Sequence, residues 1–200
     1  MNGGVDRREV ILREAAGLFA KRGVAKTTVR DIADAVGILS GSLYHHFPSK
    51  DDLLTRIITS YLDDLLARYA DVCTGTNDPL SRLHGLVTAS LETMERHPHA
   101  AEIYQNEGAY MRRLADYGEL RTAARKVQRT WIDTVNEGVA AGVLRDDIAP
   151  DVFYRLIRDA VWLSVRWYKP SASYPITRFA EDCTAVFLDG FKTDPRRRRR

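Results

Sequence analysis

The chain has 200 residues, 44% of them hydrophobic, and a formal net charge of +3 at pH 7. This length suits one or two small domains with a buried core. We expect no membrane segment, because no run approaches about 18 consecutive apolar residues. The first ten residues lack the apolar core of a signal peptide, which predicts a cytoplasmic protein.

The first predicted element is a helix over residues 6–22. Its apolar residues Ile11, Ala15, Leu18 and Phe19 follow the i, i+4, i+7, i+8 spacing of one helical face, and Gly23 follows as a helix end. We expect this helix to be scaffold, packed beneath the two helices that come next.

The segment 28–47 predicts two short helices joined by a brief turn that contains Gly37. The first helix has apolar residues at i, i+3, i+4 and i+7, and Thr28 with Asp31 forms a sequence close to a capping box. Gly37 ends it in the position typical of a C-terminal cap. Ser40 is expected to cap the second helix, whose apolar side is Leu43 with Phe47. This is the outline of a helix-turn-helix.

The outward side of the second helix predicts contact with DNA. It carries small donors, an aromatic hydroxyl and an imidazole but no acidic side chain, a surface suited to a major groove about 12 Å wide. Phosphate contacts are expected where the flanking helices begin. The predicted DNA-binding residues are Thr28, Arg30, Ser40, Gly41, Ser42, Tyr44, His45 and Lys50. The alternative is that residues 28–47 are two helices of an ordinary core.

Residues 8–54 resemble the DNA-binding domain of the TetR family of transcriptional repressors. The resemblance rests on the run TTVRDIADAVGILSGSLYHHFPSKDDLL, which has the motifs of that domain at their spacing. It implies an all-α fold of about nine helices, with three DNA-binding helices followed by a ligand-binding and dimerising body. We therefore expect a helix-turn-helix domain over 6–48, a body over 49–192 and a disordered Arg-rich tail over 193–200.

The charge distribution is consistent with a DNA-binding N-terminal domain. Residues 1–50 carry eight Lys or Arg and five Asp or Glu, a net charge of +3. Residues 51–195 carry seventeen Lys or Arg and twenty-two Asp or Glu, a net charge of −5. The last five residues are all Arg, and they could add non-specific attraction for phosphates.

The first half of the body predicts a long helix over 49–73, followed by helices from Pro79, over 100–112 and over 115–142. Ser49 and Asp52 form a second capping-box sequence at the start of the long helix. In the TetR family this helix links the effector pocket to the DNA-binding domain. The sequence His97-Pro98-His99 lacks a cysteine or acid at ligand spacing, so we expect a turn with exposed imidazoles and no metal site.

Two apolar helices are predicted at the C-terminal end, over 151–169 and 175–191. The first has apolar residues around much of its circumference, which predicts burial on more than one side. Paired with their copies across a two-fold axis, the two helices would form a four-helix interface, as in TetR-like homodimers. The alternative is that they close the core of a monomer.

The body contains no recognisable catalytic motif, so we expect a binding pocket, no enzyme activity and no cofactor. The two cysteines, Cys73 and Cys183, are expected to be free thiols. An arginine on an apolar helix needs an acid, solvent or an anionic ligand, which makes Arg158 and the nearby Trp162 candidate effector contacts. The alternatives for Arg158 are a salt bridge to Asp159 or Glu107, or a side chain that reaches solvent at the rim of a dimer. The alternative for Trp162 is a place in the core. Candidate apolar walls are Tyr61, Leu65, Leu91, Met94, Tyr104 and Trp131.

A narrower resemblance concerns the effector. ILSGSLYHHF together with RDAVWLSVRWYKP is similar to actinobacterial TetR repressors of late cholesterol catabolism. That resemblance implies a CoA thioester of a partly degraded sterol as effector and double-stranded operator DNA as partner. It also implies that Arg158 and Trp162 contact the ligand.

Two other functions stay open. A TetR-like multidrug sensor of cationic aromatics would need a buried carboxylate, for which Glu107 is the candidate. A helical enzyme or ligand carrier without DNA binding is opposed by the intact set of predicted DNA contacts on residues 28–50.

Overall fold

The computed structural model describes residues 6–191, and the described chain is helical throughout with no named strand. The prediction of an all-α fold is confirmed. Its elements are α1 (Arg7–Arg22), α2 (Val29–Val36), α3 (Ser40–His46), α4 (Lys50–Gly75), α5 (Pro79–Arg96), α6 (Pro98–Asn106), α7 (Gly108–Met111), α8 (Tyr117–Ala140), α9 (Pro150–Trp162), the 3₁₀ helix η1 (Leu163–Arg166) and α10 (Ile176–Phe191).

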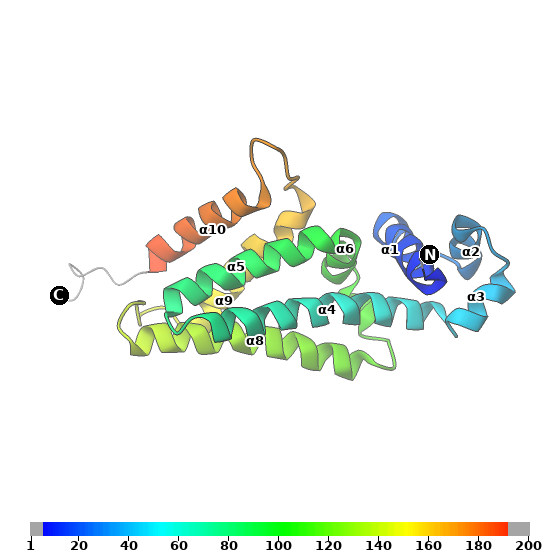
Figure 1. Cartoon of the computed structure of the whole chain (residues 1–200). Coiled ribbons are helices and arrows are strands. Elements are labelled where there is room, and N and C mark those ends of the chain that lie inside the picture. The colour runs from blue at the N-terminus through cyan, green and yellow to red at the C-terminus, as the bar shows by residue number, and fades with distance from the viewer. Residues whose placement is uncertain (1–5, 192–200) are drawn as a thin grey trace. The chain divides into compact units, whose positions relative to one another are not determined.

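The described residues form two compact units, and helix α4 contributes to both of them (Figure 1). Unit 1 contains residues 6–62 and 97–121, and unit 2 contains residues 63–96 and 122–191. The predicted helix-turn-helix segment, 6–48, lies entirely in unit 1. The proposed domain boundary at residue 48 stays a prediction. No helix in residues 6–191 has the length and hydropathy needed to cross a membrane.

Unit 1 is built around a small apolar core shared by α1, α2, α3 and the first half of α4. Helix α1 packs against α2 and α6, and α2 packs against α3. Most of the apolar positions expected from the helical spacing are buried, including Ile11, Phe19, Ile32, Leu43 and Phe47. Leu18, Val29 and Val36 are only half-buried. Burial of Leu43 and Phe47 fixes the orientation of α3, because these two residues occupy the side opposite its polar residues.

Unit 2 has its core where α5 packs against α9 and α10. Its central side chain is Trp131 of α8, which is completely buried. One charged residue is also buried in this unit. Arg82 of α5 pairs with Glu137 of α8 and donates a hydrogen bond from Nη2 to the carbonyl oxygen of Thr76 at 3.2 Å.

Two predicted helices are divided in the structure. The expected helix 151–169 ends as an α-helix at Trp162 and continues as the tighter η1, where the Ser164 hydroxyl donates to the Val161 carbonyl at 2.5 Å. Competition of a serine hydroxyl for backbone carbonyls favours such a change of helix type. The expected helix 100–112 is interrupted at Glu107, which ends α6 and precedes α7.

The predicted break at His97-Pro98-His99 is limited to His97, which separates α5 from α6, and only the imidazole of His99 is exposed as expected. Pro98 is the first residue of α6, a position that tolerates proline because its backbone N–H needs no partner there. His97 is half-buried and meets the Tyr61 ring edge-on, with centroids 6.2 Å apart. The predicted disordered tail, 193–200, lies outside the described residues.

Candidate DNA-binding face and effector site

The turn between α2 and α3 has a fixed geometry. Gly37 adopts a left-handed conformation with φ 71° and ψ 40°. The N–H of Ile38 donates to the carbonyl of Ala33 at 3.0 Å, and that of Gly37 donates to Asp34 at 3.2 Å. These are the two hydrogen bonds of a Schellman motif. A residue with a Cβ is strained at this φ, so glycine favours the turn by which the chain enters α3.

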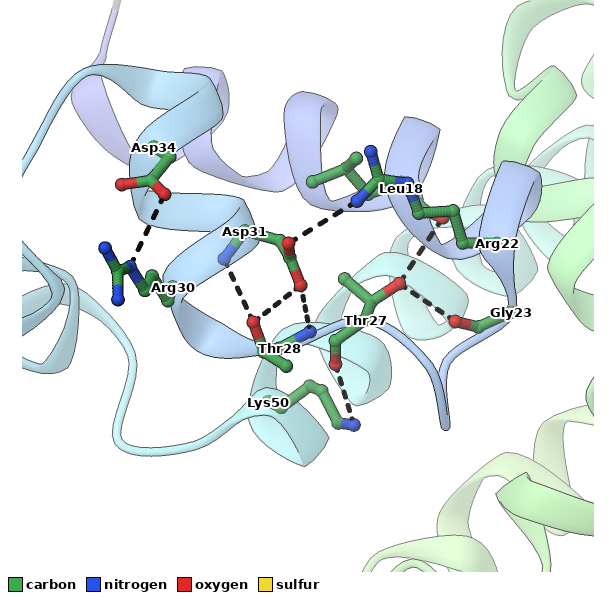
Figure 2. Close-up of polar contacts among 9 residues, drawn as sticks. All are labelled: Leu18, Arg22, Gly23, Thr27, Thr28, Arg30, Asp31, Asp34 and Lys50. Carbon is green, nitrogen blue, oxygen red and sulfur yellow. Dashed lines mark hydrogen bonds and ion pairs between the residues drawn. The ribbon is translucent and has the colours of Figure 1, made fainter.

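The capping box at the start of α2 is confirmed (Figure 2). The N–H of Asp31 donates to the Thr28 hydroxyl at 3.1 Å, and the Thr28 N–H donates to an Asp31 carboxylate oxygen at 2.8 Å. The hydroxyl of Thr28 donates to the same oxygen at 2.5 Å. These two bonds from Thr28 hold the pKa of Asp31 below its usual value. The DNA contact of Thr28 stays a prediction, and its hydroxyl already stabilises the helix start.

Thr27, which precedes Thr28, is a structural residue. It is fully buried, and its hydroxyl donates to the carbonyl of Gly23 at 2.9 Å (Figure 2). Adjacent threonines thus have different roles, one closing the α1–α2 turn and the other capping α2.

Helix α3 presents the predicted recognition face to solvent. Tyr44 is 53% exposed, whereas Leu43 beside it is fully buried. Gly41 and His45 are also exposed, and a Cβ added at Gly41 would meet no atom within 4 Å. Ser40 and Ser42 are half-buried. The face is therefore accessible and low in bulk, as a surface that enters the major groove must be.

The expected cap of α3 is wrong in one respect. The N-cap residue is Leu39, which makes no side-chain cap, and Ser40 is the first helical residue. The backbone of Leu39 supplies the start of the helix, because its carbonyl accepts from the N–H groups of Ser42 at 2.9 Å and Leu43 at 3.3 Å.

Arg30 extends from the exposed side of α2. Its side chain is 85% exposed, and its Nε lies 3.8 Å from a carboxylate oxygen of Asp34 (Figure 2). A surface pair of this kind contributes little to stability. The guanidinium can therefore exchange this partner for a phosphate, and its predicted DNA contact stays a prediction.

Lys50 has a structural role that the sequence did not indicate. Its ammonium group donates to the carbonyl of Val24 at 2.8 Å and to that of Thr27 at 3.0 Å. Figure 2 shows the second of these bonds, which joins the start of α4 to the α1–α2 turn. Two of its three donors are thus directed to the protein backbone. Its predicted phosphate contact stays a prediction, with one donor available.

Replacement of Lys50 separates these two roles. We expect Lys50→Met to lower the free energy of unfolding by about 1–3 kcal/mol, because two carbonyls lose a charged donor. If the lysine serves only the turn, the slope of log affinity against log salt should stay at the wild-type value. A lost phosphate contact would reduce that slope by about 0.9.

Both quantities can be measured on the same variants by urea unfolding and by operator titration in different salt concentrations. Lys26→Met is the matched control, because Lys26 is exposed in the same turn. Unchanged stability with a smaller salt slope would assign Lys50 to DNA alone.

A second contact holds the start of α4 within unit 1. The Tyr110 hydroxyl of α7 donates to a carboxylate oxygen of Asp51 at 2.8 Å. Burial of the phenol and this bond to a carboxylate raise the pKa of Tyr110 to about 12. The Lys50 ammonium lies 5.6 Å from the centroid of the Tyr110 ring, within cation–π range. The α6–α7 segment is therefore joined to the start of α4, the helix that follows α3.

Unit 2 contains an aromatic cluster that includes two of the predicted effector contacts, Trp131 and Trp162. Trp131 and Trp162 meet edge-on with centroids 6.3 Å apart, and Tyr154 lies 6.5 Å from each of them. The indole N–H of Trp131 donates to the Tyr69 hydroxyl at 2.9 Å, and the Tyr69 and Ser90 hydroxyls are 2.6 Å apart. The Ser90 hydroxyl donates in turn to the Leu86 carbonyl at 2.7 Å, so Tyr69 is the donor to Ser90.

Trp162 differs from Trp131 in its hydrogen bonding. Trp162 is 4% exposed, and its indole N–H has no hydrogen-bond partner among the described residues. Leaving a buried donor without an acceptor is unfavourable by about 1–3 kcal/mol. A buried unsatisfied donor in an aromatic cluster is a position where a ligand oxygen could bind.

Arg158 stands one helical turn before Trp162, and its side chain is 44% exposed. Its guanidinium pairs with Asp159, at 2.7 Å from Nη2 to the carboxylate, and lies 5.8 Å from the centroid of the Tyr154 ring. Of the alternatives considered for this arginine, the ion pair with Asp159 is present in the structure. An accessible guanidinium beside the aromatic cluster is also available to an anionic ligand, and that role stays a prediction.

The other predicted wall residues are divided between the units. Leu65, Leu91 and Met94 are buried in unit 2 together with Trp131. Tyr61 and Tyr104 belong to unit 1, where their rings lie 5.9 Å apart. Glu107, the carboxylate expected of a multidrug site, is also in unit 1 and is half-exposed.

The C-terminal helices leave several large apolar side chains in solvent. Val152 and Leu156 of α9 are 45% and 58% exposed, and Val186 of α10 is 73% exposed. The prediction that α9 is buried on more than one side fails at Leu156, although Phe153, Ile157 and Val161 are buried as expected. An exposed apolar face on two adjacent helices is typical of a protein–protein interface.

Cys73 and Cys183 are free thiols, and burial raises the pKa of Cys183 to about 11. Neither is poised as a nucleophile, because a raised pKa keeps the thiol protonated. Residues 6–191 contain no group of three or more side chains that could hold a metal ion.

Comparison with known proteins agrees with this architecture. Residues 11–57 match the family described as bacterial regulatory proteins, tetR family, and residues 76–191 match a tetracyclin repressor-like C-terminal domain. The chain is 41% identical over 184 residues to the HTH-type transcriptional repressor KstR2 of Mycobacterium tuberculosis H37Rv, an alignment that covers 92% of each protein. It is 40% identical over 192 residues to KstR2 of Rhodococcus jostii RHA1, covering 94% of this chain and 93% of that protein.

A solved structure shows the same fold. The ketosteroid transcriptional regulator KstR2 of Mycobacterium tuberculosis aligns with a TM-score of 0.89 and 40% identity, over 96% of this chain and 98% of that one. Similarity over this length includes both the helix-turn-helix and the body. The chain therefore belongs to the TetR family of bacterial transcriptional regulators and is a TetR-type repressor rather than an enzyme.

Proposed function

We propose that the chain is a homodimeric repressor that binds a pseudo-palindromic operator and is released by a sterol-derived acyl-CoA. The regulated genes would be those of cholesterol or steroid catabolism. The observation that carries this proposal is the buried Trp162 indole N–H without an acceptor, one helical turn from the accessible Arg158. The relatives named KstR2, one of them described as a ketosteroid regulator, support the same class of effector.

The chemistry of the cluster suits a large apolar ligand that also carries oxygen atoms and negative charge. Aromatic rings of Trp131, Tyr154 and Trp162 offer apolar surface. A carbonyl oxygen of the ligand would satisfy the indole N–H of Trp162. Arg158 would meet an anionic group such as the phosphates of CoA, because guanidinium groups bind phosphate through paired hydrogen bonds.

The exposed apolar face of the C-terminal helices supports the homodimer. Val152, Leu156 and Val186 would be buried if two copies paired across a two-fold axis. A dimer places two α3 helices on one face of the DNA, and a separation of about 34 Å would let them enter successive major grooves. The operator would then be a pseudo-palindrome.

A thermal-shift panel on the purified protein tests the effector. It would contain CoA alone, simple acyl-CoAs, steroid-derived acids, their CoA thioesters and cationic dyes. A ligand at about 100 times its Kd should stabilise the protein by about 2.7 kcal/mol, which raises Tm by about 5–10 °C. We expect this shift only with the steroid-derived CoA thioesters.

The role of Arg158 is tested in the same panel. Arg158→Met should abolish the shift produced by the thioesters, because the anionic group loses its partner. Arg155→Met is the matched control, since Arg155 lies on the same helix and its side chain is 66% exposed beside Asp151. Equal shifts in the wild type and both variants would exclude a ligand contact by Arg158.

The second candidate function is a sensor of cationic hydrophobic compounds. The half-exposed Glu107 carboxylate is the feature that favours it. Stabilisation by cationic dyes but not by thioesters would support this sensor and contradict the steroid effector.

A further inference from the structure

The most exposed large apolar side chain among the described residues belongs to Leu39, which is 80% exposed. It lies at the N-terminal boundary of α3, on the helix that carries the predicted recognition face. The preceding residue, Ile38, is half-buried. Two adjacent apolar residues of the turn therefore have different environments, and the leucine is the one left in solvent.

The position of Leu39 is fixed by the backbone on both sides. On the N-terminal side, the Ile38 N–H donates to the Ala33 carbonyl in the Schellman motif at Gly37. On the C-terminal side, the Leu39 carbonyl accepts the first two hydrogen bonds of α3. Its backbone is extended, with φ −73° and ψ 144°. The fixed backbone sets the direction in which the side chain leaves the turn, so no backbone rearrangement is needed for Leu39 to meet a partner.

The residues around Leu39 are small. Ser40, Gly41 and Ser42 follow it, and the space beyond Gly41 is open. The leucine is thus the bulky apolar group at this end of the helix, in an otherwise polar surface. A single exposed leucine is common on protein surfaces. Its place on a rigid turn at the DNA-binding face makes a specific contact the better explanation.

Leucine has no hydrogen-bond donor or acceptor in its side chain, so it can distinguish bases only by an apolar contact. In the major groove the apolar group is the C5-methyl of thymine. We propose that Leu39 is a specificity-determining residue that contacts a thymine C5-methyl in each operator half-site. This inference rests on the proposed operator binding through α3.

The size of the effect follows from the methyl group. Removal of one buried methyl should weaken binding about fourfold, equivalent to about 0.8 kcal/mol. A symmetric operator loses two methyls at once, one in each half-site, and should bind about 15-fold more weakly. A contact with the sugar-phosphate backbone would produce no such dependence on the base.

The experiment uses a duplex that the full-length wild-type protein selects from a randomised library, labelled with fluorescein. Each symmetric pair of thymines is replaced in turn by deoxyuridine, which removes only the methyl groups. Affinity is measured by fluorescence anisotropy for the wild type and for Leu39→Ala. We expect one thymine pair whose replacement lowers the affinity of the wild type about 15-fold. The same replacement should lower the affinity of Leu39→Ala by less than about twofold.

Controls separate this contact from a general defect. Leu39→Ala should unfold at the wild-type urea concentration, because the side chain is exposed, and Leu39→Met should keep the dependence on the same thymine pair. The inference is overturned if no deoxyuridine replacement lowers the affinity of the wild type. It is also overturned if every replacement lowers the affinity of the wild type and of Leu39→Ala by the same factor. If the wild type enriches no duplex at all, operator binding itself fails, and with it the inference about Leu39.

Discussion

Tyr44→Ala should weaken operator binding by about 100-fold or more, a loss of about 2.7 kcal/mol. Tyr44 is the large side chain of the outward face of α3 and is 53% exposed, while its neighbour Leu43 fills the core. Its ring and hydroxyl can therefore both contact DNA without any change in the fold. An aromatic residue at the centre of a binding face often dominates its energy.

The measurement is a fluorescence-anisotropy titration of a wild-type-selected duplex. Tyr44→Phe separates the contribution of the hydroxyl from that of the ring. Tyr174→Ala is a control for the loss of a tyrosine elsewhere, because Tyr174 belongs to unit 2 and is also exposed. Circular dichroism should show unchanged helix content for Tyr44→Ala. Unchanged operator affinity in this variant would exclude α3 as the recognition helix.

Trp131→Ala should destabilise the protein by about 3–5 kcal/mol, which corresponds to a Tm lower by about 6–20 °C. Trp131 is completely buried, contacts the rings of Tyr69, Tyr154 and Trp162, and donates a hydrogen bond to the Tyr69 hydroxyl. Its removal leaves a cavity and one fewer donor in a buried polar network. The cavity and the lost hydrogen bond both lower the free energy of unfolding of the same variant.

Urea unfolding followed by circular dichroism measures this loss. Trp131→Phe is the graded comparison, since it keeps an aromatic ring but removes the indole N–H, and we expect about 1–2 kcal/mol of destabilisation. A midpoint that moves with an unchanged slope would show that stability itself has changed. An alanine variant within about 1 kcal/mol of the wild type would show that the aromatic cluster is not the core of unit 2.

The local features of the DNA-binding segment were predictable from the sequence because their causes are local. Thr28 with Asp31 predicted the capping box, and the glycine after the apolar spacing predicted the left-handed cap at residue 37. The helical class followed in the same way from apolar periodicity. Each of these depends on residues within about one or two helical turns of one another.

Lys50 shows where this reasoning reaches its limit. A lysine at the start of a helix behind a predicted recognition helix is expected to meet phosphate. The structure directs two of its hydrogen bonds to carbonyls that lie 23 and 26 residues earlier. No pattern in the neighbouring sequence indicates which distant carbonyls will lack a partner.

Leu39 and Leu156 show the same limit for apolar residues. Hydrophobic spacing predicts which side of a helix or turn is apolar. It does not predict whether another element covers a leucine on that side. Leu39 is left in solvent while Ile38 is half-buried, and Leu156 is exposed on a helix expected to be covered.

The sequence by itself therefore determined the all-α class, the helix-turn-helix, its caps and the TetR family resemblance. Only the tertiary structure decided that Lys50 supports the α1–α2 turn, that Leu39 is presented to solvent, and that the Trp162 N–H is buried without an acceptor. The physical reason is that capping and periodicity act between near neighbours in the chain. Burial and hydrogen-bond satisfaction depend on contacts between residues far apart in it.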